Sequence, residues 1–245
     1  VNAGSLEKKL LERYGGPTAE AMVHSARDNI ARIEDLGFDQ IKVSLKASDV
    51  ARTVAAYRLL AQGTDLALHV GVTEAGGLFP GVVKSALGIG MLLADGIGDT
   101  LRVSLTRDPV EEIRVGYEIL KALDIRRRGP EIISCPTCGR TRIDLFKMEE
   151  TIEQALLGCR LPLKIAIMGC TVNGPGEARE ADIGVAGGED RGVLFRHGRV
   201  VQTLPQDRLV PSLLEEVARL EAQAAAESMH GEDEPNPDKP ELTID

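Results

Sequence analysis

The sequence predicts an α/β protein that starts with parallel β/α units and ends with a smaller α+β domain. In residues 1–125, short apolar runs rich in β-branched residues alternate with helix-length amphipathic segments. This alternation is typical of parallel strands covered on both faces by the intervening helices. The strands recur at the interval of one β/α unit, as in a barrel or a doubly wound sheet. No Gly-x-Gly-x-x-Gly turn follows any of them, which disfavours the dinucleotide-binding sheet and favours a TIM-type (β/α) barrel.

Capping residues place the helices of this first part. Thr18 can cap a helix whose apolar positions recur at helical spacing, Ser48 or Asp49 can start the next, and Asp108 with Pro109 opens a later one. The helices are expected at 18–37, from 48 or 49 onwards, at 82–94 and at 109–123. Strands are expected at 41–45, 66–72, 100–105 and 131–134, whereas a closed barrel takes eight strands.

The segment 126–130, Arg-Arg-Arg-Gly-Pro, marks the expected domain boundary. We predict a partial barrel at residues 1–128, a second domain at 129–227 and a tail at 228–245. The tail is rich in Pro, Asp and Glu and is expected to be disordered. The second domain should hold a helix at 148–157, strands at 163–168 and 183–185, a hairpin of 193–195 with 200–204 that turns at His197-Gly198, and a closing helix at 207–226.

Composition and charge exclude several classes of function. With 43% apolar residues, the 245-residue chain can bury a full core, and it shows neither a bilayer-length apolar run nor a secretion signal. We therefore expect a soluble, cytoplasmic protein without a membrane partner. A net charge of -9 and few aromatic residues argue against nucleic-acid binding, although a local basic pocket for phosphate is compatible with them. Four cysteines in such a chain favour metal or redox chemistry over disulfides.

Three cysteines and a glutamate form a candidate metal site. Cys135 and Cys138 make a Cys-x-x-Cys turn, and Cys170 precedes a Gly-Pro-Gly loop that could fold Glu177 back towards the same centre. Thiolates are soft ligands for iron–sulfur clusters, zinc or Cu(I). One alternative is a structural zinc site, with Cys159 as a fourth ligand, in an interaction module fused to part of a barrel. The other is a reversible dithiol of Cys135 and Cys138.

Polar side chains cluster where the expected barrel strands end, at the edge that carries the chemistry of (β/α) barrels. Fixed cations and hydroxyls there suit phosphoryl oxygens, although ion pairs at a barrel rim are an alternative. Ser44 and Lys42 are weaker candidates, because alternation along a strand should turn one of them away from the site. The strand-end residues are Lys46, Thr73, Glu74, Arg102 and Ser104.

Several long motifs occur in one order along residues 1–205: segments 1–8, 41–50, 73–77 and 98–104, then Cys-Thr-Val-Asn-Gly-Pro-Gly-Glu at 170–177. In these motifs the chain closely resembles the 4-hydroxy-3-methylbut-2-enyl diphosphate synthases, the iron–sulfur reductases of the non-mevalonate isoprenoid pathway. In that family the motif at residues 1–4 lies at the end of a mid-barrel strand. The resemblance therefore implies a C-terminal portion of a longer protein, with the second half of its barrel.

The resemblance also implies a reaction and roles for the candidate residues. The reaction is the two-electron reductive ring opening and dehydration of 2-C-methyl-D-erythritol 2,4-cyclodiphosphate, with electrons from flavodoxin or ferredoxin. Glu74 would act as general acid, its protonated form favoured by apolar barrel residues around it. The family's cluster domain closes over the barrel of a second subunit, which implies a homodimer. A 4Fe-4S cluster would be held by Cys135, Cys138, Cys170 and Glu177, and the diphosphate by Asn2, Lys46, Thr73, Arg102 and Ser104.

Overall fold

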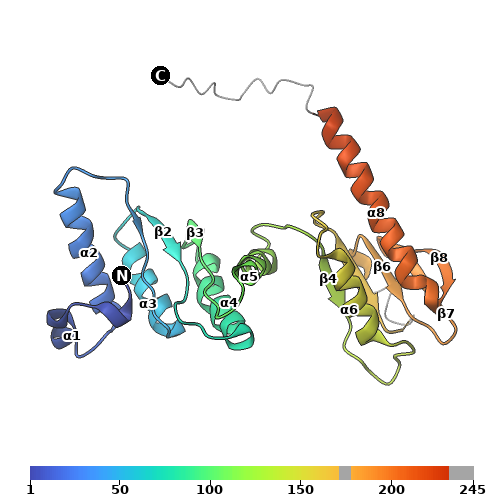
Figure 1. The fold of residues 1–245 in the computed structure, drawn as a ribbon, viewed down its shortest axis with the longest axis horizontal. Coiled ribbons are helices and arrows are strands. Elements are labelled where there is room, and N and C mark those ends of the chain that lie inside the picture. Colours follow the sequence, from blue (N-terminus) through green and yellow to red (C-terminus); the bar gives the residue numbers. More distant parts are fainter. Residues whose placement is uncertain (171–177, 232–245) are drawn as a thin grey trace. The chain divides into compact units, whose positions relative to one another are not determined.

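The computed structural model describes residues 1–170 and 178–231. The chain divides into two compact units, Val1–Arg127 and Arg128–Asp245, whose elements can be followed in Figure 1. The predicted domain boundary falls one residue after this division. Each unit has its own hydrophobic core, so we describe them one at a time.

The first unit is built on a parallel sheet of order β1-β2-β3. Its strands are β1 (Lys42–Val43), β2 (Ala67–Val70) and β3 (Thr100–Leu101). They lie in the predicted segments but are shorter, because a strand includes only the residues whose backbone pairs with a neighbouring strand through hydrogen bonds. An isolated parallel bridge between Asn2 and Lys46 continues the pairing beyond β1. The α/β class with parallel strands is therefore confirmed for this unit.

Helices follow the strands of the first unit, and their predicted caps are present. The Thr18 hydroxyl accepts a hydrogen bond from the Ala21 N–H at 3.2 Å, and Asp49 accepts from the Arg52 N–H at 2.7 Å. Asp108 likewise accepts a hydrogen bond from the Val110 N–H at 2.9 Å. The elements are η1 (Ala3–Ser5), α1 (Lys8–Tyr14), α2 (Ala19–Glu34), α3 (Val50–Ala61), α4 (Leu78–Ala94) and α5 (Pro109–Ala122).

Helix α4 begins four residues before the predicted start at residue 82. Its N-cap is Gly77, and Pro80 lies in its first turn. A proline is tolerated there because the first N–H groups of a helix have no partner within the helix. The helix predicted at 82–94 began after this proline, so its start was wrong.

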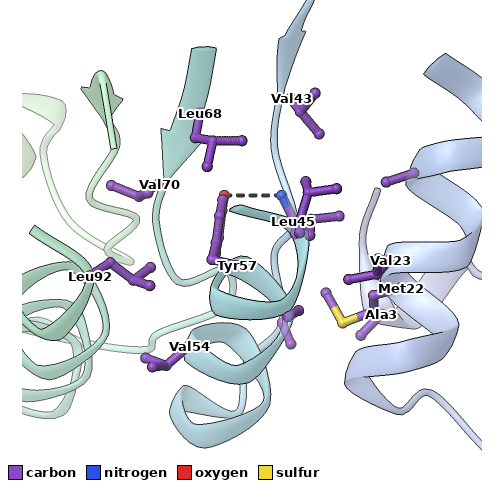
Figure 2. Close-up of a cluster of buried hydrophobic side chains, with 14 of the residues drawn as sticks. Ala3, Met22, Val23, Val43, Leu45, Val54, Tyr57, Leu68, Val70 and Leu92 are labelled. Carbon is purple, nitrogen blue, oxygen red and sulfur yellow. Dashed lines mark hydrogen bonds between the residues drawn. The ribbon is translucent and has the colours of Figure 1, made fainter. Parts of the chain in front are cut away.

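The core of the first unit packs the strands against α2, α3 and α4, and Figure 2 shows its central side chains. Tyr57 of α3 is fully buried among them, together with Met22, Leu45 and Leu92. Its hydroxyl accepts a hydrogen bond from the Leu45 N–H at 3.0 Å and donates one to the His69 carbonyl at 2.5 Å. One side chain thus joins the backbones beyond β1 and within β2.

Replacing Tyr57 with phenylalanine should lower the free energy of unfolding by about 1–3 kcal/mol. The substitution keeps the ring but leaves the buried Leu45 N–H without its partner, which costs roughly this much. Chemical denaturation measures the change. Tyr14→Phe is the matched control, because the Tyr14 hydroxyl contacts His24 in a half-buried position where water can replace it. An equal loss in both variants would contradict the bridging role of Tyr57.

The second unit contains a mixed sheet of order β4-β5-β6-β7-β8. Strands β4, β5 and β6 are parallel, and β6, β7 and β8 are antiparallel. Helices α6 and α8 contact each other and the sheet, and buried isoleucines and leucines fill the space between them. The elements are β4 (Glu131–Ser134), α6 (Leu145–Leu156), β5 (Lys164–Met168), η2 (Ala178–Glu180), β6 (Ile183–Ala186), β7 (Arg191–Arg196), β8 (Arg199–Pro205) and α8 (Gln206–Gly231).

Strand β4 corrects one prediction. The sequence analysis counted residues 131–134 with the barrel strands, although its domain boundary placed them in the second domain, and a strand does form there. Its partner is β5, however, with Glu131 opposite Lys164 and Ser134 opposite Ile167. An apolar strand is stabilised by whichever edge it pairs with, and local sequence does not specify that edge. The strand therefore belongs to the second unit.

The end of the second unit agrees with the prediction in its hairpin and differs in its last helix. His197 and Gly198 have φ values of +45° and +71°, which is the conformation of a two-residue hairpin turn. Helix α8 continues to Gly231, four residues into the predicted tail. Residues 232–245 lie outside the described part. Every helix in the described residues is too short or too polar to cross a lipid bilayer.

Candidate functional site

Basic side chains gather beyond the carboxyl ends of β1 and β2 in the first unit. Along residues 42–47, Val43, Leu45 and Ala47 are buried, whereas the residues that alternate with them are not. Lys42, Ser44 and Lys46 therefore lie on the same face of the strand. Alternation cannot place Lys42 and Ser44 on opposite faces, because they are two residues apart. The sequence-based expectation that one of those two turns away was wrong.

Lys46 is the centre of this basic cluster. A Cβ atom built on Gly71 would lie 3.6 Å from Lys46 Cε and would collide with the Arg102 carbonyl. The Lys46 side chain therefore lies over the end of β2, next to the backbone that leaves β3. Burial lowers the pKa of Lys46, and the Arg102 guanidinium lowers it further. Because a side chain would fill this space, glycine at position 71 keeps it open.

The charge of the cluster is not balanced within the described residues. There, neither Lys46 nor Arg102 comes within ion-pair distance of a carboxylate. The alternative of ion pairs at a barrel rim therefore has no support for these two side chains. Two neighbouring cations without a counter-charge provide a favourable position for an anion.

His69 belongs to the same cluster, and the sequence-based analysis missed it. Its Nδ1 lies 2.8 Å from the Thr100 hydroxyl across the β2–β3 pair. Burial lowers the pKa of His69, and Lys46, Lys42 and Arg102 lower it further, in that order. The imidazole is therefore neutral near neutral pH. The alternation of side chains along β2 could have identified His69, because His69 and Gly71 are two residues apart and therefore lie on the same face of the strand.

The other predicted substrate residues lie at the same strand ends, with unequal support. Asn2 bridges to Lys46 through the backbone, and the Thr73 N–H donates to the Ala47 carbonyl at 3.2 Å. Ser104 lies two residues after Arg102 and is half-buried. Backbone contacts therefore bring Asn2 and Thr73 to the segment that carries Lys46. The placement of Ser104 rests on its position in the chain.

Glu74 differs from its predicted environment. It lies in the loop after β2 with a φ of +53°, and its side chain is exposed. The apolar surroundings expected for it are absent from the described part of the first unit. The reason is positional, because the strand ends at Val70 and leaves Glu74 on a turn.

Two of the three candidate cysteines follow neighbouring parallel strands in the second unit. Cys135 comes directly after β4, and Cys170 is the second residue after β5. Parallel strands end at the same edge of a sheet, so the topology brings both residues to one edge. The Gly169 N–H donates a hydrogen bond to Cys135 Sγ at 3.2 Å, which links the two strand ends directly.

The turn that carries Cys138 is attached to the same edge. The Cys138 N–H donates to the Thr141 hydroxyl at 3.1 Å, and the Thr141 N–H donates to the Cys138 carbonyl at 3.0 Å. The Arg142 N–H then donates to the Gly169 carbonyl at 3.1 Å. This loop is therefore connected by its backbone to the segment that leads into Cys170.

The sulfur atoms differ in how well they suit a metal. The backbone N–H of Arg140 lowers the pKa of the exposed Cys138 thiol, with help from the side chains of Arg140 and Thr141. In contrast, burial raises the pKa of Cys159 to about 11, and the nearby Glu221 carboxylate adds to this. N–H donors stabilise thiolates, the form that binds metals. Cys138 and Cys135 therefore each have a backbone N–H donor that favours the metal-binding form, whereas the surroundings of Cys159 disfavour it.

The described residues do not form a closed metal site. Among them, no group of three or more Cys, His, Asp and Glu side chains is close enough to share an ion. Cys135 and Cys170 lie at one edge, and Cys138 reaches it by a loop. The fourth predicted ligand, Glu177, lies outside the described residues.

Comparisons with known proteins agree with both units. The model of the GcpE TIM-barrel domain matches residues 1–117, and the model of the GcpE protein C-terminal domain matches residues 131–219. This chain belongs to the GcpE family. The family predicted from the sequence motifs is therefore confirmed, since curated relatives carry the name 4-hydroxy-3-methylbut-2-en-1-yl diphosphate synthase (flavodoxin).

The similarity to these GcpE relatives extends over most of the chain. The protein from Geobacter sulfurreducens is 60% identical over 223 residues, which are 91% of this chain and 63% of the relative. The proteins from Lawsonia intracellularis and Desulfotalea psychrophila are each 56% identical over 224 residues, which are 91% and 90% of this chain and 62% of each relative. The chain thus spans about three fifths of the length of the curated relatives it matches.

Proposed function

We propose that this chain provides diphosphate-binding and iron–sulfur parts of an enzyme that makes 4-hydroxy-3-methylbut-2-enyl diphosphate. The substrate would be 2-C-methyl-D-erythritol 2,4-cyclodiphosphate, whose ring opens by reduction while one oxygen leaves as water. The observation that supports this most is the uncompensated pair Lys46 and Arg102, combined in one chain with thiols at a single sheet edge. The names of the relatives agree with this activity.

In the first unit, the proposed role is to bind and orient the diphosphate. Its parallel strands would form part of a TIM-type barrel, with the basic cluster at their carboxyl ends. Lys46 and Arg102 would donate charge-assisted hydrogen bonds to phosphoryl oxygens. Asn2, Thr73 and Ser104 would add neutral donors around them. The neutral imidazole of His69 would donate or accept a hydrogen bond without adding charge.

Glu74 would hold the proton that the departing oxygen takes up. The Glu74 side chain is exposed in this structure, so this role requires that its surroundings change when substrate binds. Covering the loop after β2 would remove water from Glu74 and favour its protonated form. A homodimer in which a second copy covers the loop would supply that change.

In the second unit, the proposed role is to hold a 4Fe-4S cluster. Cys135, Cys138 and Cys170 would be its thiolate ligands and Glu177 the fourth. When bound, such a cluster supplies single electrons, which flavodoxin or ferredoxin would replace. The N–H of Gly169 would continue to donate to Cys135 Sγ, and hydrogen bonds of this kind tune the potential of a cluster.

Metal and sulfide analysis tests this proposal directly. After anaerobic purification, we expect about four iron atoms and four sulfide ions per chain, with visible absorption that bleaches in air. Stoichiometric zinc without sulfide in folded protein would instead support the structural zinc module and contradict the redox function. Absence of any metal, with a reversible Cys135–Cys138 disulfide, would support the dithiol.

A further inference from the structure

Thr141 is the side chain that connects the Cys138 turn to the end of β5. Its hydroxyl accepts a hydrogen bond from the Cys138 N–H at 3.1 Å, and its own N–H donates to the Cys138 carbonyl. A Cβ atom built on Gly169 would lie 3.0 Å from both Oγ1 and Cγ2 of Thr141. The Thr141 side chain therefore packs directly on the residue that precedes Cys170.

Gly169 contacts both parts of the candidate cluster site. Its N–H donates to Cys135 Sγ at 3.2 Å, and its carbonyl accepts a hydrogen bond from the Arg142 N–H at 3.1 Å. Because it has no side chain, it leaves the space that Thr141 occupies. The contact between Thr141 and Gly169 therefore links the Cys138 turn to the strand end that also carries Cys135.

Separate contacts anchor the part of the loop that follows Thr141. The Gln206 side chain, at the start of α8, donates to the Arg142 carbonyl at 3.3 Å and to two carbonyls of the loop after β6 at 2.5 Å each. Ile143 packs on Gly187, where an added Cβ would lie 2.5 Å from its Cγ2. This part of the loop should therefore keep its place when Thr141 is replaced.

We propose that Thr141 is a positioning residue for the cluster: its hydroxyl holds the Cys138 turn while its methyl group lies against Gly169. The turn then presents its sulfur atom at the edge where Cys135 and Cys170 lie. Each cysteine of a 4Fe-4S cluster binds a different iron atom, so the spacing of the sulfur atoms decides whether a cluster fits. The proposal rests on the proposed function for the presence of a cluster, and it names a residue that prepares the site.

Threonine suits both contacts because its hydroxyl and methyl groups branch from one carbon. Branching at Cβ restricts the rotation of the side chain, so the methyl group against Gly169 also fixes the direction of the hydroxyl. Serine keeps the hydroxyl and loses the methyl group, whereas valine keeps both branches and loses the hydroxyl. These two substitutions therefore separate the hydrogen bond to the Cys138 N–H from the packing on Gly169.

The test compares Thr141→Val with Thr141→Ser in anaerobically purified protein. Residues that orient metal ligands contribute roughly tenfold to a hundredfold in metal affinity. We expect Thr141→Val to lose its iron to a chelator faster than the unchanged protein by about this factor. Its reduction potential should also shift, because the released Cys138 N–H changes the hydrogen bonding around the sulfur atoms. Thr141→Ser should restore both the slow iron loss and the potential.

Thr151→Val is the matched control for the valine substitution. Thr151 lies on α6, where its hydroxyl donates to the Lys147 carbonyl at 2.6 Å and contacts no cysteine. The control should keep the iron-loss rate and the potential of the unchanged protein. Iron loss and potential that are the same in Thr141→Val and Thr151→Val would overturn the proposal and leave the proposed function standing. Absence of iron and sulfide from the unchanged protein would overturn both.

Amide exchange decides the matter if Thr141→Val takes up no iron. In iron-free samples, the Cys138 N–H should exchange faster in Thr141→Val than in the unchanged protein, because its partner is missing, and Thr141→Ser should slow the exchange again. The amides of β4 and β5 should stay protected in all three proteins. Loss of protection throughout the sheet in Thr141→Val would mean that Thr141 supports the whole fold, and the positioning role would be wrong.

Discussion

Replacing Cys170 with serine is expected to abolish iron and sulfide incorporation while leaving the fold intact. A serine hydroxyl is a hard ligand with a high pKa and replaces a thiolate poorly on iron. Cys170 is half-exposed and belongs to neither core, whereas Cys135 packs against both clusters of buried residues in the second unit. Cys170 is therefore the cleaner position to test. Iron, sulfide and visible absorption measure the loss, and circular dichroism verifies the fold.

Cys159→Ser is the matched control for this substitution. Its thiol has a pKa raised to about 11, so it is protonated at neutral pH, and it packs at the edge of the second core. We expect this variant to keep its iron and sulfide. Loss of both from a folded Cys159→Ser protein, with retention in Cys170→Ser, would mean that the proposed ligand set is incorrect.

Replacing Lys46 with methionine is expected to weaken the binding of inorganic pyrophosphate by roughly tenfold to a hundredfold. Hydrogen bonds to a charged group contribute about 1.5–3 kcal/mol, and each 1.4 kcal/mol corresponds to a factor of ten in affinity. Methionine keeps the length of the side chain beside Gly71 and removes the charge. Calorimetric titration at two salt concentrations measures the affinity, and the salt dependence should decrease with the charge.

Lys8→Met controls for the change in net charge. Lys8 is 91% exposed on α1 and does not contribute to the lowered pKa of Lys46 or of His69, so its loss should change the affinity little. The imidazole of His69 gives a second signal, because Lys46 is the leading charge that lowers its pKa. Its NMR titration should move to higher pH in Lys46→Met and stay unchanged in Lys8→Met. Equal weakening by both substitutions would mean that pyrophosphate senses only total charge.

The lowered pKa of His69 also has a consequence for stability. The unfolded chain binds a proton at His69 more readily than the folded chain does, so this group opposes folding as the pH decreases. Above the ordinary histidine pKa, the contribution of His69 to the free energy of unfolding is fully present. This stability is lost progressively as the pH falls below about 6.5, towards the lower pKa of the folded state.

Local chemistry explains which parts of this structure could be predicted. Thr18, Asp49 and Asp108 cap helices through bonds to residues two or three positions away, so a short stretch of sequence contains both partners. The same holds for the hairpin turn at His197-Gly198. The start of α4 was missed for a local reason too, because Pro80 is compatible with both a loop and a first helical turn.

Non-local pairing explains the rest. Strand β4 was counted with the barrel strands because no feature of residues 131–134 specifies that they pair with β5. His69 was missed because its pKa depends on Lys46, Lys42 and Arg102, which meet only after three strands have paired. Glu74 was expected among apolar side chains, and a left-handed backbone position on a turn leaves it exposed instead.

The sequence by itself determined the α/β class, the helix caps, the Cys-x-x-Cys turn and the family motifs, because each depends on residue types at fixed spacing. Only the tertiary structure decided which sheet holds β4, that Gly169 hydrogen-bonds Cys135 Sγ, and that Lys46 and Arg102 lie together with no ion-pair partner among the described residues. It also decided that Phe79, Val83 and Leu87 of α4 are exposed. Hydrogen bonds, fields and burial act through space, so they become defined only when distant segments of the chain are brought together.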